Sequence, residues 1–188
     1  ALGDELPSTH KDDYAAAIIV GGSMSANDKD NFILYEKDWI QVPLKENVPF
    51  LGICLGAQLL ACSVGGSIKI KDHVEIGYYP IKPTEYGKSI ISWPPFVHQW
   101  HREWMEPPKE AKLMAVGQND EPQAFQYSDR AYGIQFHSEL TLAMVNRWLV
   151  KAEHRLVLNG AQKREKHFEG RYIYDGHVKT WLNNFFDL

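Results

Sequence analysis

The segment that most constrains the fold is a short apolar run, Phe50–Ile53, that leads directly into Cys54. A glycine stands two positions before this cysteine and another two positions after it, at Gly52 and Gly56. Small residues at these positions let a chain turn sharply from a strand into a helix. The turn presents the cysteine at the N-terminus of that helix, where the partial positive charge of the backbone favours thiolate over thiol. The segment therefore predicts a nucleophile at a strand-to-helix turn.

A second segment that carries catalytic residue types is Tyr132–Glu139, an extended run closed by His-Ser-Glu. Residues two apart on an extended chain face the same side. We therefore expect His137 and Glu139 to lie together, with the carboxylate orienting the imidazole. Together with Cys54 they would form a nucleophile, a base and an orienting acid. The alternative is that His137 and Glu139 form an ion pair at a strand end with no catalytic role.

The two segments resemble the motifs of the class I, triad-type glutamine amidotransferases. The family pattern around the nucleophile is G-[IV]-C-x-G-x-Q, which Gly52–Gln58 matches, and its distal strand ends in His-Pro-Glu. Here Ser138 stands in place of the proline, which keeps both catalytic side-chain types and is expected to loosen the turn that holds them. Further stretches resemble small stand-alone members of the family similar to the amidotransferase of GMP synthase, namely residues 75–78, 98–101 and 122–126.

The resemblance implies a role for individual residues. Cys54, His137 and Glu139 would be the catalytic triad. The glycine pair that follows the first strand-like run looks like the oxyanion-hole segment of the family, so the N–H groups of Gly22 and Leu55 are expected to bind the oxyanion. The family chemistry implies neither a metal nor another cofactor.

Substrate contacts are expected from the same motif. The residue that matches Gln58 helps to bind glutamine in the family, and Gly52 and Gly56 would let the substrate approach the backbone closely. His98 and His101 have a spacing that could serve a metal, but no familiar ligand cluster completes it. They are otherwise interpreted as polar loop residues at the pocket rim, or as residues that shape the substrate cleft.

The expected reaction is hydrolysis of the side-chain amide of glutamine, or of another γ-glutamyl compound, through a thioester on Cys54. Ammonia would then pass to an acceptor on a synthetase subunit, because the chain has no P-loop pattern of its own. A stand-alone γ-glutamyl hydrolase would form the same thioester. A catalytically silent relative that binds a ligand or a protein remains a third hypothesis.

The order of patterns predicts an α/β fold: a flavodoxin-like three-layer sandwich with a mainly parallel central sheet and an antiparallel extension. The expected strands are 15–20, 50–53, 68–70, 79–82, 112–117, 123–127 and 131–136. The expected helices are 31–44, with a break or end at Pro43, then 55–64, 141–158 and 177–186.

We expect residues 1–188 to form a single amidotransferase-like domain. The family fold begins with a strand and a helix ahead of Tyr14, and residues 1–13 do not read as a strand. We therefore expect the given chain to be incomplete at its N-terminus, or else its sheet to lack a strand.

The net charge of −4 argues against a nucleic-acid partner, and the apolar runs are too short to span a membrane. Two cysteines are too few for a disulfide framework, which favours a cytoplasmic protein. Cys62 reads as a structural, buried thiol, because it lies inside an apolar run. The mixed-sign run Lys163–Lys166 reads as a solvated helix end or loop.

Overall fold

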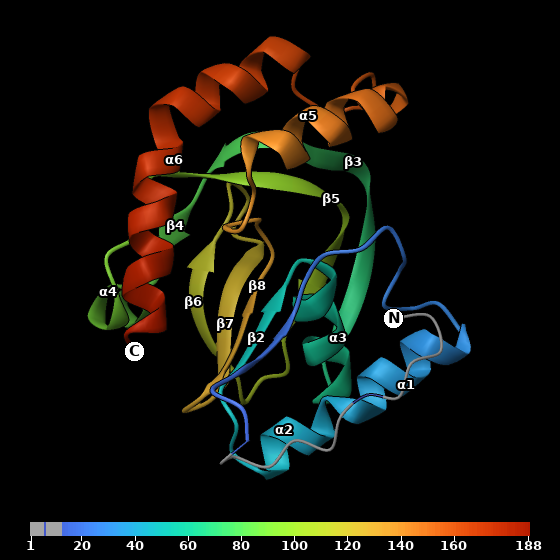
Figure 1. Cartoon of the computed structure of the whole chain (residues 1–188), viewed down its shortest axis with the longest axis vertical. Helices are drawn as coiled ribbons and strands as arrows, with labels where there is room; N and C mark the ends of the chain where they lie inside the picture. The colour runs from blue at the N-terminus through green and yellow to red at the C-terminus, as the bar shows by residue number, and fades with distance from the viewer. Residues whose placement is uncertain (1–5, 7–12) are drawn as a thin grey trace.

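A mixed six-stranded sheet crosses the middle of the computed structural model, which describes Leu6 and residues 13–188 (Figure 1). Three neighbouring strands run parallel, and three more continue the sheet in antiparallel pairs, so that four of the six share one direction. In spatial order the strands are β1 (Ala17–Ile19), β2 (Phe50–Ile53), β8 (Ala131–Ile134), β7 (Pro122–Ser128), β6 (Lys112–Val116) and β4 (Lys82–Pro83). The expected α/β fold, with parallel strands at its centre and an antiparallel extension, is confirmed.

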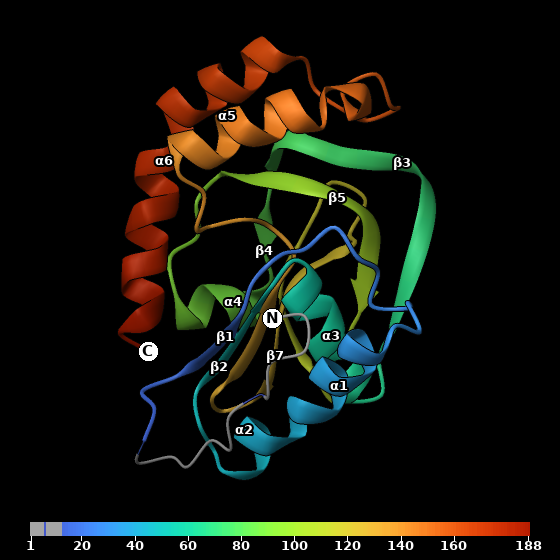
Figure 2. The same ribbon diagram turned by 45° about the vertical axis from the view of Figure 1, so that its right-hand side comes forward.

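Helices cover both faces of this sheet because β2 buries side chains on both sides. Phe50 points into one apolar cluster and Leu51 into another, as alternation along a strand requires. The first cluster is covered by α1 (Asn31–Trp39), α2 (Gln41–Lys45) and α3 (Leu55–Ser63), and the second by α4 (Glu85–Ile90) and α6 (Arg164–Phe186). Figures 1 and 2 show the two layers of helices on either side of the sheet.

Two long antiparallel strands, β3 (Ser67–Pro80) and β5 (Phe96–Glu106), form a second sheet that curves over one end of the first. Above it lie α5 (Leu142–Lys151), the short 3-10 turn Glu153–Arg155 and the first half of α6 (Figure 2). The sequence patterns predicted β3 only in part and missed β5. Since β5 buries polar and apolar residues alike, it carries no alternating apolar pattern.

The placement of His98 and His101 in a loop was therefore wrong. Both lie on β5 and both are buried.

The helix boundaries differ from the expected ones for local reasons. The expected helix 31–44 is divided at Ile40, three residues before Pro43, because a proline cannot hydrogen-bond to the residue four positions earlier and clashes with its carbonyl. Thr141 caps α5 as expected, since its hydroxyl accepts a hydrogen bond of 3.2 Å from the backbone N–H of Met144. That helix ends at Lys151 rather than 158, and α6 begins thirteen residues earlier than expected, at Arg164.

Strand β1 is shorter and more exposed than the buried strand expected at 15–20. It spans Ala17–Ile19, and the side chain of Ile18 is 46% exposed. Among the described residues, β1 pairs with β2 alone, so it lies at an edge of the sheet. Most of the expectation about residues 1–13 falls outside the described residues. Within residues 13–188, no helix is both long enough and apolar enough to cross a bilayer.

Trp181 is the most buried of the apolar residues by which α6 packs against the sheet, and this gives a prediction for stability. Trp181 is 2% exposed and packs against Trp93, Phe136 and Phe185. We expect Trp181→Ala to lower the free energy of unfolding by about 3–5 kcal/mol, because it leaves a cavity in the core. Urea denaturation measures the change. The control on the same helix is Tyr172→Ala, whose side chain is 93% exposed and whose loss should cost under about 0.5 kcal/mol. Equal effects of the two substitutions would contradict this packing.

Candidate active site

Cys54 lies at a strained turn between β2 and α3. Its backbone has φ 52° and ψ −106°, a positive φ that residues with a side chain rarely adopt. The backbone N–H of Cys54 donates a 2.8 Å hydrogen bond to the carbonyl of Ile134 in the neighbouring strand β8. This is the geometry of a nucleophile elbow, in which strain in the turn aims the side chain out of the sheet.

Gly52 and Gly56 make the turn possible because the backbones approach too closely for side chains. A Cβ atom at Gly52 would lie 2.4 Å from the carbonyl oxygen of Gly56, and one at Gly56 would lie 2.0 Å from the carbonyl oxygen of Ile19. Both glycines are buried at the crossing of β1, β2 and α3. This close packing explains why glycine is required at both positions. The expected contact of Gly52 and Gly56 with the substrate stays a prediction.

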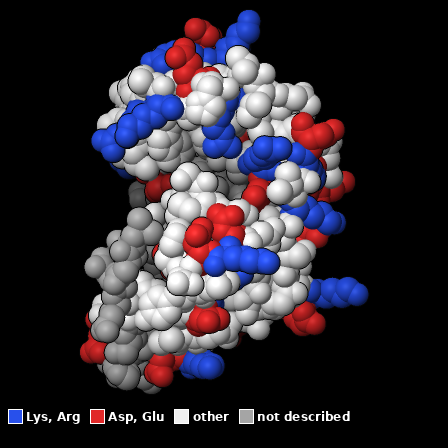
Figure 3. All heavy atoms as spheres, turned by 90° about the vertical axis from the view of Figure 1, so that its right-hand side faces the viewer, with Lys and Arg blue, Asp and Glu red and all other residues white. Residues whose placement is uncertain are grey.

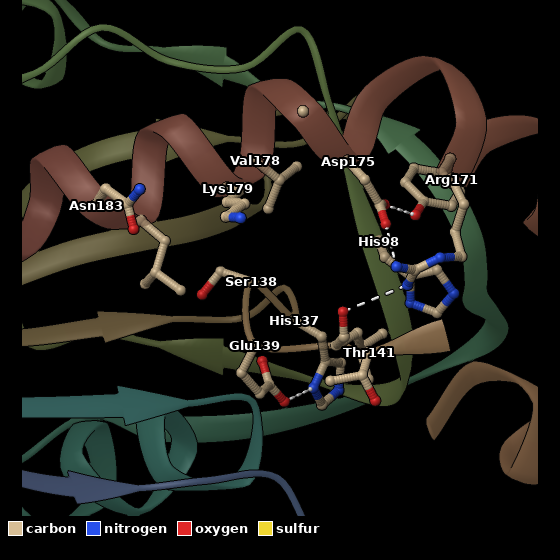
Figure 4. Close-up of a pocket in the computed structure, with 14 residues that line it drawn as sticks. His98, His137, Ser138, Glu139, Thr141, Arg171, Asp175, Val178, Lys179 and Asn183 are labelled. Atoms are coloured by element: carbon tan, nitrogen blue, oxygen red, sulfur yellow. Dashed lines mark hydrogen bonds and ion pairs between the residues drawn. The ribbon is translucent and has the colours of Figure 1, made fainter. Parts of the chain in front are cut away.

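His137 and Glu139 lie together, as the sequence predicts. Nδ1 of His137 is 2.7 Å from Oε1 of Glu139, and Figure 4 shows the two side chains side by side. The backbone N–H of His137 donates a 2.9 Å hydrogen bond to the carbonyl of His98, and the ring of Trp148 packs edge-on against the imidazole at 4.9 Å. Ser138, which replaces the family proline, projects away from His137 toward α6, so the His–Glu contact forms without the proline (Figure 4).

The charge of His137 is set by its two neighbours. Burial lowers the pKa of the imidazolium, but the facing Cys54 sulfur, to which it hydrogen-bonds, and the Glu139 carboxylate outweigh that cost and raise the pKa to about 10. His137 is therefore a cation at neutral pH. It lies in position to stabilise a thiolate on Cys54 and to give up a proton.

Gln135 is a site residue that the sequence analysis missed. Its side chain is fully buried, and its Nε2 lies 3.8 Å from the sulfur of Cys54. The orientation of the amide follows from its other end, because Oε1 accepts a hydrogen bond of 3.3 Å from the backbone N–H of Met105. An N–H group of Gln135 is thereby aimed at the sulfur. The sequence could have indicated Gln135, because it stands two residues before His137 and residues two apart face the same side of an extended chain.

Cys54 opens into two adjoining cavities. The larger has a volume of about 520 Å³ and is lined by Gly22, Gln58 and Glu103 among others. The smaller has a volume of about 270 Å³ and is lined by Gly22, His137 and residues of α5. Gly22 thus faces both cavities beside the cysteine. The N–H of Leu55 is the first of α3, where helical N–H groups lack intrahelical partners.

The larger cavity brings together polar residues from four parts of the chain, at positions 25–28, 58, 101–103 and 154–155. Nε2 of Gln58 donates a 2.9 Å hydrogen bond to the carbonyl of Glu103, which fixes the amide at the cavity wall. The carboxylate of Glu103 accepts a 2.8 Å hydrogen bond from Ser25. Asp28 and His101 line the same cavity. The structure therefore brings Gln58 beside Cys54, where the sequence analysis expects a substrate contact.

Of the remaining sequence candidates, Cys62 and His98 line neither cavity, whereas His101 lines the larger one. Cys62 is half-buried against the core, and burial raises the pKa of its thiol. Nε2 of His98 lies 3.1 Å from Nδ1 of His167, and Nε2 of His101 lies 3.0 Å from Oε2 of Glu75. Within the described part of the chain, no group of three or more His, Cys, Asp or Glu side chains is arranged to hold a metal ion.

Comparison with known proteins finds the same family that the sequence motifs resemble. The family model for glutamine amidotransferase class-I matches residues 4–155. The chain belongs to the class I glutamine amidotransferase family. Among its curated relatives, the glutamine amidotransferase-like protein YfeJ of Salmonella typhimurium is 27% identical over 164 residues, which cover 82% of this chain and 68% of the relative. One subunit of the glutamine-hydrolyzing GMP synthase of Sulfurisphaera tokodaii is 29% identical over 140 residues, which cover 72% of this chain and 73% of the relative.

Solved structures of similar proteins share the fold. A glutamine amidotransferase from Thermotoga maritima is 28% identical, with a TM-score of 0.80, over 100% of this chain and 84% of that one. A glutamine amido transferase from Methylobacillus flagellatus is 24% identical, with a TM-score of 0.89, over 99% of this chain and 79% of that one. The second likeness is evidence for the fold alone.

The arrangement predicts how the His137 pKa responds to its neighbours. Cys54→Ala removes the facing sulfur, and Glu139→Gln removes the carboxylate charge, so each should bring the pKa below about 10 while burial continues to lower it. Titration of isotope-labelled imidazole by NMR measures this change. A His137 pKa that stays the same in both variants would contradict the assigned contacts.

Gln135 gives a second prediction at this site. Gln135→Leu should slow alkylation of Cys54 by iodoacetamide at pH 7 by about tenfold, because a hydrogen bond to a charged group is worth about 1.5–3 kcal/mol. The matched control is Gln123→Leu, at a buried glutamine that hydrogen-bonds to Gln99 and Glu75 instead. Equal rates in the two variants would show that the amide of Gln135 does not act on the sulfur.

Proposed function

We propose that this chain hydrolyses the side-chain amide of glutamine through a γ-glutamyl thioester on Cys54 and releases ammonia for transfer to an acceptor. The observation that carries the proposal is a strained cysteine at a nucleophile elbow that faces a buried imidazolium–carboxylate pair. Such an arrangement is costly to build and is suited to covalent catalysis. It also speaks against a silent binding protein, which would need none of it.

The first step forms the thioester. The thiolate of Cys54 attacks the amide carbon, and the resulting oxyanion meets the N–H groups of Gly22 and Leu55. The protonated His137 gives its proton to the leaving nitrogen, which departs as ammonia. We propose that Gln58 helps to bind the glutamine from the larger cavity, where it lies beside Cys54.

The second step releases glutamate. Water enters the position that ammonia has left, and His137, now neutral, removes a proton from it as it attacks the thioester carbon. The C–S bond then breaks, which frees glutamate and returns the Cys54 thiolate beside a protonated His137. Glu139 keeps the imidazole oriented and stabilises its charged form in both steps. The proposed reaction consumes one water and needs neither a metal nor a redox cofactor.

The acceptor of the ammonia is proposed to lie on a partner. Relatives of this chain include GMP synthase subunits from Sulfolobus acidocaldarius and Sulfurisphaera tokodaii, which supports a separate synthetase partner. We propose that residues 1–188 act as one amidotransferase domain. Both cysteines are free thiols, which favours a reducing, cytoplasmic setting.

Glutamate release from glutamine tests this function. We expect the purified chain to release glutamate, and both Cys54→Ala and His137→Ala to reduce kcat by at least about 10³-fold, since loss of a member of such a triad typically costs this much. Cys62→Ala is the matched control at the second cysteine and should retain activity. Activity that survives Cys54→Ala would refute the thioester mechanism.

A further inference from the structure

The smaller cavity beside Cys54 is larger than the ammonia and water of glutamine hydrolysis require. It shares Gly22, Ser23, Cys54, Trp100 and Arg155 with the larger cavity. It differs in extending past His137 and under α5, where Trp148 and Lys151 line it. A substrate whose reacting carbon lies at the sulfur therefore has two spaces available, one on each side of the bond that breaks.

The position of His137 decides which space receives which part of the substrate. His137 lines the smaller cavity and is not among the residues that line the larger one. Because this residue protonates the departing nitrogen, the leaving group must lie on its side. Gln58 and Glu103 line only the larger cavity, which is thereby left for the glutamyl part. The smaller cavity is then a leaving-group site.

The volume of this leaving-group site is much greater than ammonia requires. It is about 270 Å³, whereas a molecule the size of water occupies about 30 Å³ in the liquid. The space suits an amine of the size of an amino acid. Trp100 and Trp148 form an aromatic wall, with their rings 5.4 Å apart, and favour an apolar group on that amine.

The charge at the rim of the site is positive. Lys151 and Arg155 line it, and no described carboxylate forms an ion pair with either. Arg155 is half-buried, so an anionic partner would offset its lost hydration. Figure 3 shows Lys and Arg side chains, together with Asp and Glu side chains, at the top of the molecule, which is where α5 and the first half of α6 lie in Figure 1.

We propose that the preferred donor is a γ-glutamyl amide of an apolar amino acid or peptide, whose carboxylate binds Lys151 and Arg155. The proposal rests on the thioester chemistry proposed above. The thiolate sulfur bonds to the γ-carbon as the C–N bond breaks, the proton of His137 passes to the nitrogen, and the amino acid leaves as its free amine. Water then releases glutamate, so that one γ-glutamyl amide and one water give glutamate and one amino acid.

Three substrates test the apolar leaving group and the recognition of its carboxylate separately. They are glutamine, γ-glutamyl-leucine and γ-glutamyl-leucinamide, which lacks the terminal carboxylate. We expect kcat/KM for γ-glutamyl-leucine to exceed that for glutamine by at least about tenfold, since burial of one branched side chain is worth roughly 1.5–3 kcal/mol. The preference for γ-glutamyl-leucine over γ-glutamyl-leucinamide should fall by about three- to fivefold in Lys151→Met, as expected for an exposed ion pair. Lys109→Met, at an exposed lysine outside both cavities, is the matched control and should keep the wild-type preference.

The outcomes separate this inference from the proposed function. If glutamine is hydrolysed as well as γ-glutamyl-leucine, or better, the leaving-group site is wrong and the glutaminase proposal stands. If Lys151→Met leaves the preference for the carboxylate unchanged, the assigned recognition is wrong. If the purified protein hydrolyses none of the three compounds, the proposed function fails and this inference fails with it.

Discussion

The strained backbone of Cys54 is the constraint on which the rest of the site depends. Three parallel strands lie side by side in the order β1, β2, β8, and their carboxyl ends meet at one edge of the sheet. Gly22 follows the first of these strands, Cys54 the second and His137 the third. Cys54, at the end of β2, therefore lies between Gly22 and His137. Close packing at Gly52 and Gly56 holds the turn at Cys54 in place.

A buried polar layer between the two sheets supports the floor of the larger cavity. Glu75 on β3 lies 3.0 Å from His101 on β5 and accepts a 3.0 Å hydrogen bond from Gln123 on β7. Gln123 in turn accepts a 2.7 Å hydrogen bond from Gln99 on β5. The two hydrogen bonds of Gln123 join β7 to both strands of the second sheet, and buried bonds of this kind fix one relative position of the strands. The layer therefore sets where His101 and Glu103 meet the cavity.

The sequence predicted the parts of the structure that depend on local signals. Strand β2 has the expected bounds, 50–53, because glycine spacing and the following helix mark both of its ends. The contact of His137 with Glu139 also follows from spacing along one extended segment. Strand β5 and the amide of Gln135 were missed, because their burial is decided by partners far along the chain. No periodic pattern records such partners, and buried histidine and glutamine look like exposed ones in a sequence.

The most direct test of the account is to identify the atom that carries the acyl group during turnover. The reaction with glutamine would be quenched in acid within the first turnover, and the chain digested and mapped by mass spectrometry. The account predicts one γ-glutamyl group, on the peptide that contains Cys54, and none on the peptide that contains only Cys62. Glutamate formed in the burst with Cys54 unmodified, or a γ-glutamyl group on Cys62 instead, would contradict it.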